Sequence, residues 1–142
     1  MDAAPTVILT VPKPPSLNKL WRHEHGRRKR SAEYAAWLRE AGWEVKRQYT
    51  GRPAISCRFN IEIQVPISRR DTGNWEKPIG DLLEMCGVVT NDGNAHRLTV
   101  TPMQREDCAV AIYELPDMGN VRPPARKGWV GPARPTKPTA DA

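Results

Sequence analysis

Apolar and polar residues alternate most clearly in the middle of the chain, between residues 55 and 67. The apolar members are Phe59, Ile61, Ile63 and Val65, and the polar ones are Asn60, Glu62 and Gln64. A period of two predicts a strand with one buried face. Shorter runs of β-branched and apolar residues predict three further strands, over residues 6–11, 96–101 and 108–115.

Two other segments repeat apolar residues at helical spacing. The first begins after Ser31, which is placed as an N-cap, and ends before Gly51 and Pro53. Its apolar face is Tyr34, Trp37, Leu38, Ala41 and Val45. The second runs from about Asn74 to Cys86, with Gly87 as its C-cap, and we expect its Pro78 in the first turn, where a missing N–H costs least.

The element order β, α, β, α, β, β predicts an α+β fold, a small mixed sheet flanked by helices. The composition changes at Pro116, after which proline and basic residues dominate. We therefore predict one domain over residues 1–115 and a disordered, proline-rich basic tail over residues 116–142.

The net charge of +6 favours a polyanionic partner, such as nucleic acid. No apolar run approaches the roughly 20 residues of a membrane span, and no signal-peptide pattern begins the chain, so we expect a cytoplasmic protein without a membrane partner. The three cysteines, Cys57, Cys86 and Cys108, are far apart and are interpreted as reduced thiols rather than a zinc site.

Charged and polar residues gather where the alternating strand gives way to the second helix, in the stretch Arg69-Arg70-Asp71-Thr72-Gly73-Asn74-Trp75-Glu76-Lys77. Asp71 follows the strand, and Asp92 follows the helix. If the helix packs back along the sheet, we expect the chain to return to the same end and the two acids to converge. Two carboxylates suffice for Mg²⁺, which retains several waters. Lys77 shares a helix face with Asp81 and could neutralise charge on a bound phosphate.

Each of these features also has a purely structural interpretation. The residues around Asp71 could cap the helix, and Asn91-Asp92-Gly93 could be only a connecting turn. Lys77 and Asp81 could form a surface ion pair worth about 0.3–0.5 kcal/mol. Spacing alone leaves both interpretations open.

The same residues resemble the signature of the RusA-type Holliday-junction resolvases, which are phage- and prophage-associated endonucleases. The family pattern is an arginine-rich lead, D-x-D-N-x-x-K, an acid four residues later, and G-[hydrophobic]-x-x-D-D in a turn. Here it is Arg69 to Lys77, then Asp81, then Gly87-Val88-Val89-Thr90-Asn91-Asp92. The family's P-P-S-x-N corresponds to Pro14-Pro15-Ser16-Leu17-Asn18, and its basic loop and helix start correspond to Trp21–Glu33. The resemblance covers roughly residues 6–115.

The resemblance implies a homodimer that nicks four-way DNA junctions in pairs, in recombination and repair, with Mg²⁺ or Mn²⁺ and no small-molecule cofactor. By position, Asp71 and Asp92 match metal-binding carboxylates, and Lys77 matches the catalytic lysine. The chain departs from the pattern at Gly73 and Asn91, where the family has aspartates. We favour Asp81 as the replacement ligand, with Glu76 and Asn91 as the other candidates.

Basic residues on either side of this site are interpreted as DNA contacts. The run Arg27, Arg28, Lys29 and Arg30 is expected in a loop beside Trp21, and Arg69, Arg70 and Asn74 flank the proposed site. The pair His23 and His25 lacks matching partners for a metal site.

Three functions compete at this point. The leading hypothesis is a metal-dependent endodeoxyribonuclease that acts on branched DNA. The second is a non-catalytic, structure-selective DNA-binding protein in which Gly73 marks a decayed metal site. The third is a small basic interaction module whose proline-rich tail recruits a partner domain.

Overall fold

A four-stranded mixed sheet forms the centre of the computed structural model, which describes residues 4–16, 19–69 and 73–124. The strands are β1 (Val7–Val11), β4 (Arg58–Pro66), β5 (Ala95–Met103) and β6 (Cys108–Leu115), in the order β1-β6-β4-β5. Strand β6 pairs antiparallel with both β1 and β4, whereas β4 and β5 are parallel. The predicted α+β class and mixed sheet are confirmed.

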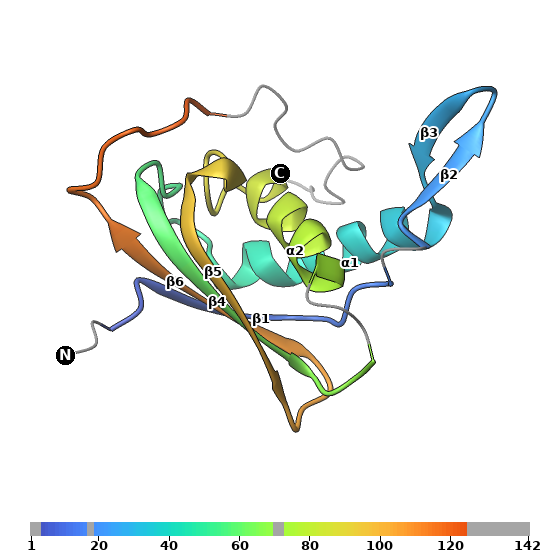
Figure 1. Cartoon of the computed structure of the whole chain (residues 1–142), viewed down its shortest axis with the longest axis horizontal. Coiled ribbons are helices and arrows are strands. Elements are labelled where there is room, and N and C mark those ends of the chain that lie inside the picture. The colour runs from blue at the N-terminus through green and yellow to red at the C-terminus, as the bar shows by residue number, and fades with distance from the viewer. Residues whose placement is uncertain (1–3, 17–18, 70–72, 125–142) are drawn as a thin grey trace.

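The two helices, α1 (Ala32–Gln48) and α2 (Gly73–Met85), cover one face of this sheet (Figure 1). The alternation in β4 explains why only that face is covered. Its apolar residues Phe59, Ile61, Ile63 and Val65 are at most 5% exposed, and its polar residues face the other side. Trp75, Ile79, Leu82 and Leu83 of α2 complete the core beneath them.

Ser31 begins α1 as predicted. Its hydroxyl accepts a hydrogen bond from the Tyr34 amide at 3.0 Å, which satisfies one of the free N–H groups of the first turn. The Ser31 amide also donates to the Leu20 carbonyl at 2.8 Å, and its hydroxyl donates to the Lys19 carbonyl. The cap therefore joins α1 to the segment that precedes it.

The segment before Ser31 corrects the predicted basic loop over residues 21–30. It is a hairpin of β2 (Trp21–Glu24) and β3 (Arg27–Arg30), which projects beyond the start of α1 (Figure 1). His25 and Gly26 have φ values of 53° and 73°, as a two-residue type I′ turn requires. The high charge obscured the strands, because charged residues are uncommon in strands that a core buries.

Helix α2 ends at a left-handed Gly87, with φ 75°, where the Val88 amide donates to the Leu83 carbonyl at 2.9 Å. The predicted C-cap is thus confirmed. Pro78 does not lie in the first turn as expected. It lies inside the helix, in the second turn, where it has no N–H to donate toward the carbonyl of Asn74.

Beyond β6, the described part of the predicted tail extends to Pro124 and returns toward the turn between α2 and β5 (Figure 1). The prediction of a disordered tail falls mainly on residues 125–142, which lie outside the described residues. Cys57, Cys86 and Cys108 are present as thiols and not as disulfides. In the described ranges, no helix is both long and apolar enough to cross a membrane.

Replacing Ser31 by alanine should lower the free energy of unfolding by about 1 kcal/mol, because the first turn of α1 loses its acceptor. Thermal or urea unfolding followed by circular dichroism measures this loss. Ser31→Thr is the matched control, since threonine keeps the hydroxyl. Equal stability of the alanine and threonine variants would contradict the assignment of the cap.

Candidate functional site

Lys77 and Asp81 occupy adjacent turns of α2 and form an ion pair, with Lys77 Nζ 3.3 Å from Asp81 Oδ1. The Tyr34 hydroxyl of α1 donates to the other carboxylate oxygen, Asp81 Oδ2, at 2.7 Å. Burial raises the pKa of Tyr34, and the hydrogen bond to Asp81 and its negative charge raise it further, so Tyr34 remains a neutral donor. Asp81 is thereby fixed between the two helices, and it holds the half-exposed Lys77 ammonium at the surface of α2.

Asp92 begins the short helix η2 (Asp92–Asn94), in the turn that leads from α2 to β5. Its carboxylate lies against α2 at Gly80, where a Cβ would stand 3.0 Å from Asp92 Oδ2. The lack of a side chain at Gly80 therefore lets this carboxylate lie close to the helix. The Asp92 amide donates to Glu84 Oε2 at 2.8 Å, one helical turn after Gly80.

Glu84 is a functional candidate that sequence reasoning missed. Burial raises the pKa of its carboxyl group, and the charges of Asp92 and Asp81 and a hydrogen bond with the Asp92 carboxyl raise it further, whereas the bond from the Asp92 amide lowers it. Its spacing from Lys77 and Gly80, at positions i+7 and i+4, places it on the same face of α2, and this spacing is the signal that could have identified it.

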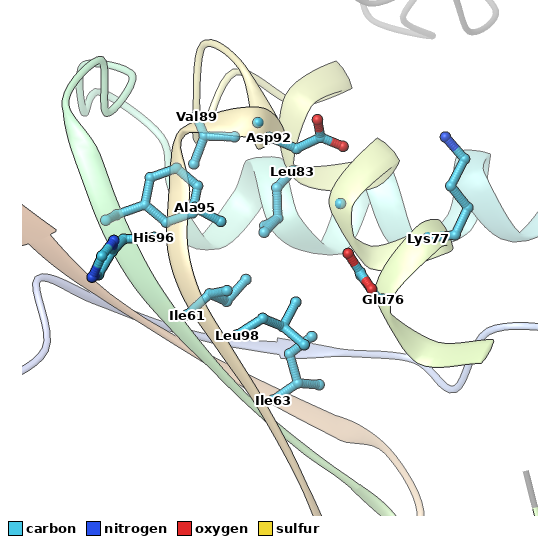
Figure 2. Close-up of a pocket in the computed structure, with 13 residues that line it drawn as sticks. Ile61, Ile63, Glu76, Lys77, Leu83, Val89, Asp92, Ala95, His96 and Leu98 are labelled. Carbon is cyan, nitrogen blue, oxygen red and sulfur yellow. The ribbon is translucent and has the colours of Figure 1, made fainter. Parts of the chain in front are cut away.

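A groove of about 530 Å³ runs between α2 and strands β4 and β5. Apolar side chains form its floor, and Glu76, Lys77 and Asp92 stand at its edge. Figure 2 shows the Asp92 carboxylate directed toward α2, Glu76 directed into the groove and Lys77 extending from the opposite side of the helix. The floor residues are Phe59, Ile61, Ile63, Leu83, Val89, Ala95 and Leu98. The charged side chains of the groove therefore lie at its edge, and its floor offers only apolar contacts.

The convergence of Asp71 with Asp92 stays a prediction, because Asp71 lies outside the described residues. Because β4 and β5 are parallel, the end of β4 and the start of β5 lie at opposite ends of the pair. Helix α2 spans the distance between them, and Asp92 meets that helix beside Gly80 rather than at its start. Gly73 and Gly80 are separated by roughly 10 Å of helix, at about 1.5 Å per residue.

Arg70 and Asp71 lie outside the described residues, so their assignment stays a prediction. The predicted residues that the structure brings together on and beside α2 are Asn74, Lys77, Asp81 and Asp92. Within residues 4–16, 19–69 and 73–124, no three His, Cys, Asp or Glu side chains are grouped closely enough to form a metal site on their own. Arg69 precedes the undescribed segment and is exposed.

The basic residues of the hairpin divide between its two faces. The Arg28 guanidinium lies 4.3 Å above the Trp21 ring, and that of Arg30 lies 5.8 Å from the Tyr34 ring. Because side chains alternate along a strand, Arg27 and Lys29 lie on the opposite face. Arg28 and Arg30 pack on aromatic rings, and Arg27 and Lys29 present positive charge on the other side.

The chain is similar in sequence to known proteins over most of its length. The chain is 29% identical to the crossover junction endodeoxyribonuclease RusA of Escherichia coli (strain K12) over 117 residues, which cover 81% of this chain and 98% of the relative. The protein of the same name from Enterobacteria phage 82 matches over the same shares. The chain is thus similar to RusA proteins. The RusA protein of Aquifex aeolicus is 27% identical over 95 residues, which cover 65% of this chain and 74% of that protein.

The resemblance to the RusA family that the sequence motifs predicted is thus confirmed. No family model matches the chain. The match to the Escherichia coli and phage 82 proteins spans nearly their full length, so the elements that carry Lys77, Asp81 and Asp92 here belong to a region shared with these two relatives.

Replacing Glu84 by glutamine should raise the melting temperature at neutral pH, because it removes a carboxylate whose ionisation burial and neighbouring acids oppose. Glutamine still offers an oxygen to the Asp92 amide. The folded-state pKa of Glu84 lies above its ordinary value of 4.5, so the wild-type chain loses stability relative to the variant as the pH rises through and above that value. Below about pH 4 the difference in stability should vanish, since Glu84 is then protonated in both the folded and the unfolded state.

Thermal unfolding between acid and neutral pH measures this difference, with the exposed Glu40→Gln on α1 as the control. A Glu84→Gln chain that is less stable than wild type at neutral pH would show that the Glu84 carboxylate is not opposed by its surroundings.

Proposed function

We propose that this protein is a metal-dependent endodeoxyribonuclease that cleaves branched DNA such as Holliday junctions. The observation that carries the proposal is the match to crossover junction endodeoxyribonucleases over 98% of their length, together with a lysine and an aspartate held on one helix of the shared region. The basic net charge of +6 supports DNA as the partner.

The residues beside Gly80 fit a hard divalent cation. The Asp92 carboxylate lies in tight contact with the position of a Cβ at residue 80, 3.0 Å away, and Glu84 supplies further carboxylate oxygens next to it. Such oxygens are what Mg²⁺ and Mn²⁺ prefer. We propose that Asp92 is a ligand of the ion. The family pattern implies Asp71 as a second ligand, and this residue lies outside the described ranges. A bound ion of this kind polarises a phosphoryl oxygen and lowers the pKa of a bound water.

Asp81 remains a candidate third ligand in place of the family's aspartate at position 73. Its two oxygens already meet Lys77 and Tyr34, which favours a second role for it, that of orienting Lys77. Lys77 is then the residue that neutralises charge developing on the cleaved phosphate. Its ammonium group is half exposed and therefore accessible to a DNA strand.

DNA contacts are proposed for the hairpin, with Arg27, Arg28, Lys29 and Arg30, and for Arg69, Arg70 and Asn74 at the start of α2. The projection of the hairpin from the body supports this, because a projecting basic arm can follow a phosphate backbone (Figure 1). A homodimer accords with paired nicking, since two strands that are cut symmetrically require two symmetrically related sites.

The substitution of the family's second aspartate by Gly73 favours one alternative, a structure-selective DNA-binding protein without cleavage. A purified chain that shifts four-way junctions in a gel but never nicks them with Mg²⁺ or Mn²⁺ would support that alternative.

Asp71→Asn and Asp92→Asn should each abolish measurable nicking of a labelled four-way junction, because a neutral amide binds a divalent cation far more weakly than a carboxylate does. Both variants should still shift the junction in EDTA. Linear duplex of the same sequence is the substrate control. Wild-type cleavage by both variants would show that the ion is held elsewhere.

Gly80→Ala should lower junction cleavage by roughly ten- to hundredfold, because the added Cβ displaces the Asp92 carboxylate. The same change should not lower the melting temperature, since alanine is favoured over glycine in a helix by about 1 kcal/mol. Gly119→Ala is the matched control, because a Cβ there would meet nothing within 4 Å. Unchanged cleavage by Gly80→Ala would remove Asp92 from the site.

Arg27→Ala/Lys29→Ala should weaken junction binding and reduce the slope of log K against log [salt] by about 1.8, at about 0.9 per lost phosphate contact. The control removes the same charge from the exposed surface of α1, in Arg39→Ala/Arg47→Ala. Fluorescence anisotropy in EDTA at several salt concentrations gives both slopes. Equal slopes for the two double variants would exclude the hairpin as a DNA-binding arm.

A further inference from the structure

The segment that follows β6 crosses back over the turn that carries Asp92. The Arg122 amide donates to Asn94 Oδ1 at 2.6 Å, and Asn94 Nδ2 donates to the Arg122 carbonyl at 3.2 Å. Asn91 Nδ2 donates to the Pro123 carbonyl at 2.8 Å. Residues 121–123, which we call the strap, are thus joined to both ends of the turn 91–94.

Asn94 anchors the strap through a side chain that is fully buried. Its side-chain amide gives one donor and one acceptor to the backbone of a single residue, Arg122, as a neighbouring strand would. A buried amide that lost these partners would incur a desolvation cost. The strap therefore satisfies a polar group that lies inside the protein.

The side chain of Arg122 packs on the turn as well. A Cβ added at Gly93 would stand 2.7 Å from Arg122 Cδ and 3.0 Å from Nε, so the arginine covers the position where a side chain at residue 93 would be. On its other side, the turn is held by Arg58 Nη1, which donates to the Gly93 carbonyl at 3.1 Å. Asp92 lies between these supports and is directly bonded to Gly93.

We propose that the strap fixes the direction of the Asp92 carboxylate, with Arg122 as a positioning residue for the metal ion. This inference rests on the proposed function. Residues that orient a ligand contribute to metal affinity although they do not touch the ion. Helix α2 sets the position of the carboxylate through Gly80, and the strap holds the turn from the opposite side.

The sign of the effect separates positioning from simple electrostatics. Loss of a positive charge near a cation site strengthens cation binding, because it removes repulsion. If Arg122 positions Asp92, its loss weakens cation binding instead. Arg122→Ala leaves the backbone bonds to Asn94 possible, so it tests the side chain alone.

The experiment uses the full chain with Mn²⁺ as the probe, titrated by electron paramagnetic resonance without DNA. Arg122→Ala and Gly93→Ala should each raise the dissociation constant for Mn²⁺ about tenfold, in the range typical of residues that support a ligand. The double variant should resemble either single one, because both changes remove the same contact. Arg122→Lys, which keeps the aliphatic stem, should restore most of the affinity.

Cleavage and junction binding complete the measurement. The Mn²⁺ concentration for half-maximal cleavage should rise in parallel with the dissociation constant, and junction binding in EDTA should not change, which shows that the variants are folded. Arg47→Ala on α1 is the control for loss of one charge. Arg122→Pro, which removes the amide donor to Asn94, should weaken Mn²⁺ binding more than Arg122→Ala.

Two failures can be told apart. Wild-type or tighter Mn²⁺ binding by Arg122→Ala, in a chain that cleaves junctions, would overturn the role of the strap alone. The role of the strap would also be overturned if Gly93→Ala raised the dissociation constant for Mn²⁺ by the same factor in the wild-type chain and in Arg122→Ala. A wild-type chain that neither binds Mn²⁺ nor cleaves would overturn the proposed function, and the positioning role with it.

Discussion

The parallel pairing of β4 with β5 is the constraint on which the rest of the site depends. Two adjacent parallel strands require a crossover that covers the length of the sheet, and here α2 supplies it. The crossover buries Trp75, Ile79, Leu82 and Leu83 on one side. Its other side carries Lys77, Gly80, Asp81 and Glu84. One helix therefore carries both core residues and the charged residues of the candidate site. Packing of its buried side against the sheet positions the backbone of the charged residues.

Much of the fold follows from residue patterns, and the exceptions have identifiable causes. The alternation in β4, the Ser31 cap and Gly87 predicted their elements because each is a local signal. The hairpin over residues 21–30 was missed because its strands are charged on both faces and have no buried alternation, although His25-Gly26 was a usable turn signal. Pro78 was expected in the first turn because helix propensity disfavours proline elsewhere. Burial of Trp75 before it and of Ile79 after it overrides that preference.

The candidate site was predictable in its parts but not in its arrangement. Lys77 and Asp81 could be paired from their spacing of four residues, and the ion pair is present. The contacts of Asp92 could not be read from spacing, because they depend on how the turn meets α2. Gly80 gave no signal as a residue type, and only its closeness to Asp92 shows why a side chain is absent there. Tyr34 read as a core aromatic, and it is also the donor that fixes Asp81.

The glycine at position 73, where the RusA-type pattern has an aspartate, leaves fewer acidic side chains for the proposed ion. Position 73 lies in the first turn of α2, and Glu84 is about 16 Å further along the helix at about 1.5 Å per residue, so the glycine changes little in the charges around Glu84. If Asp92 is a ligand as we propose, its placement matters more when another ligand is missing. Gly80 lies against the Asp92 carboxylate, and Glu84 accepts a hydrogen bond from the Asp92 amide. The Arg122 side chain packs on the adjoining Gly93, so the turn that carries Asp92 is supported from both sides.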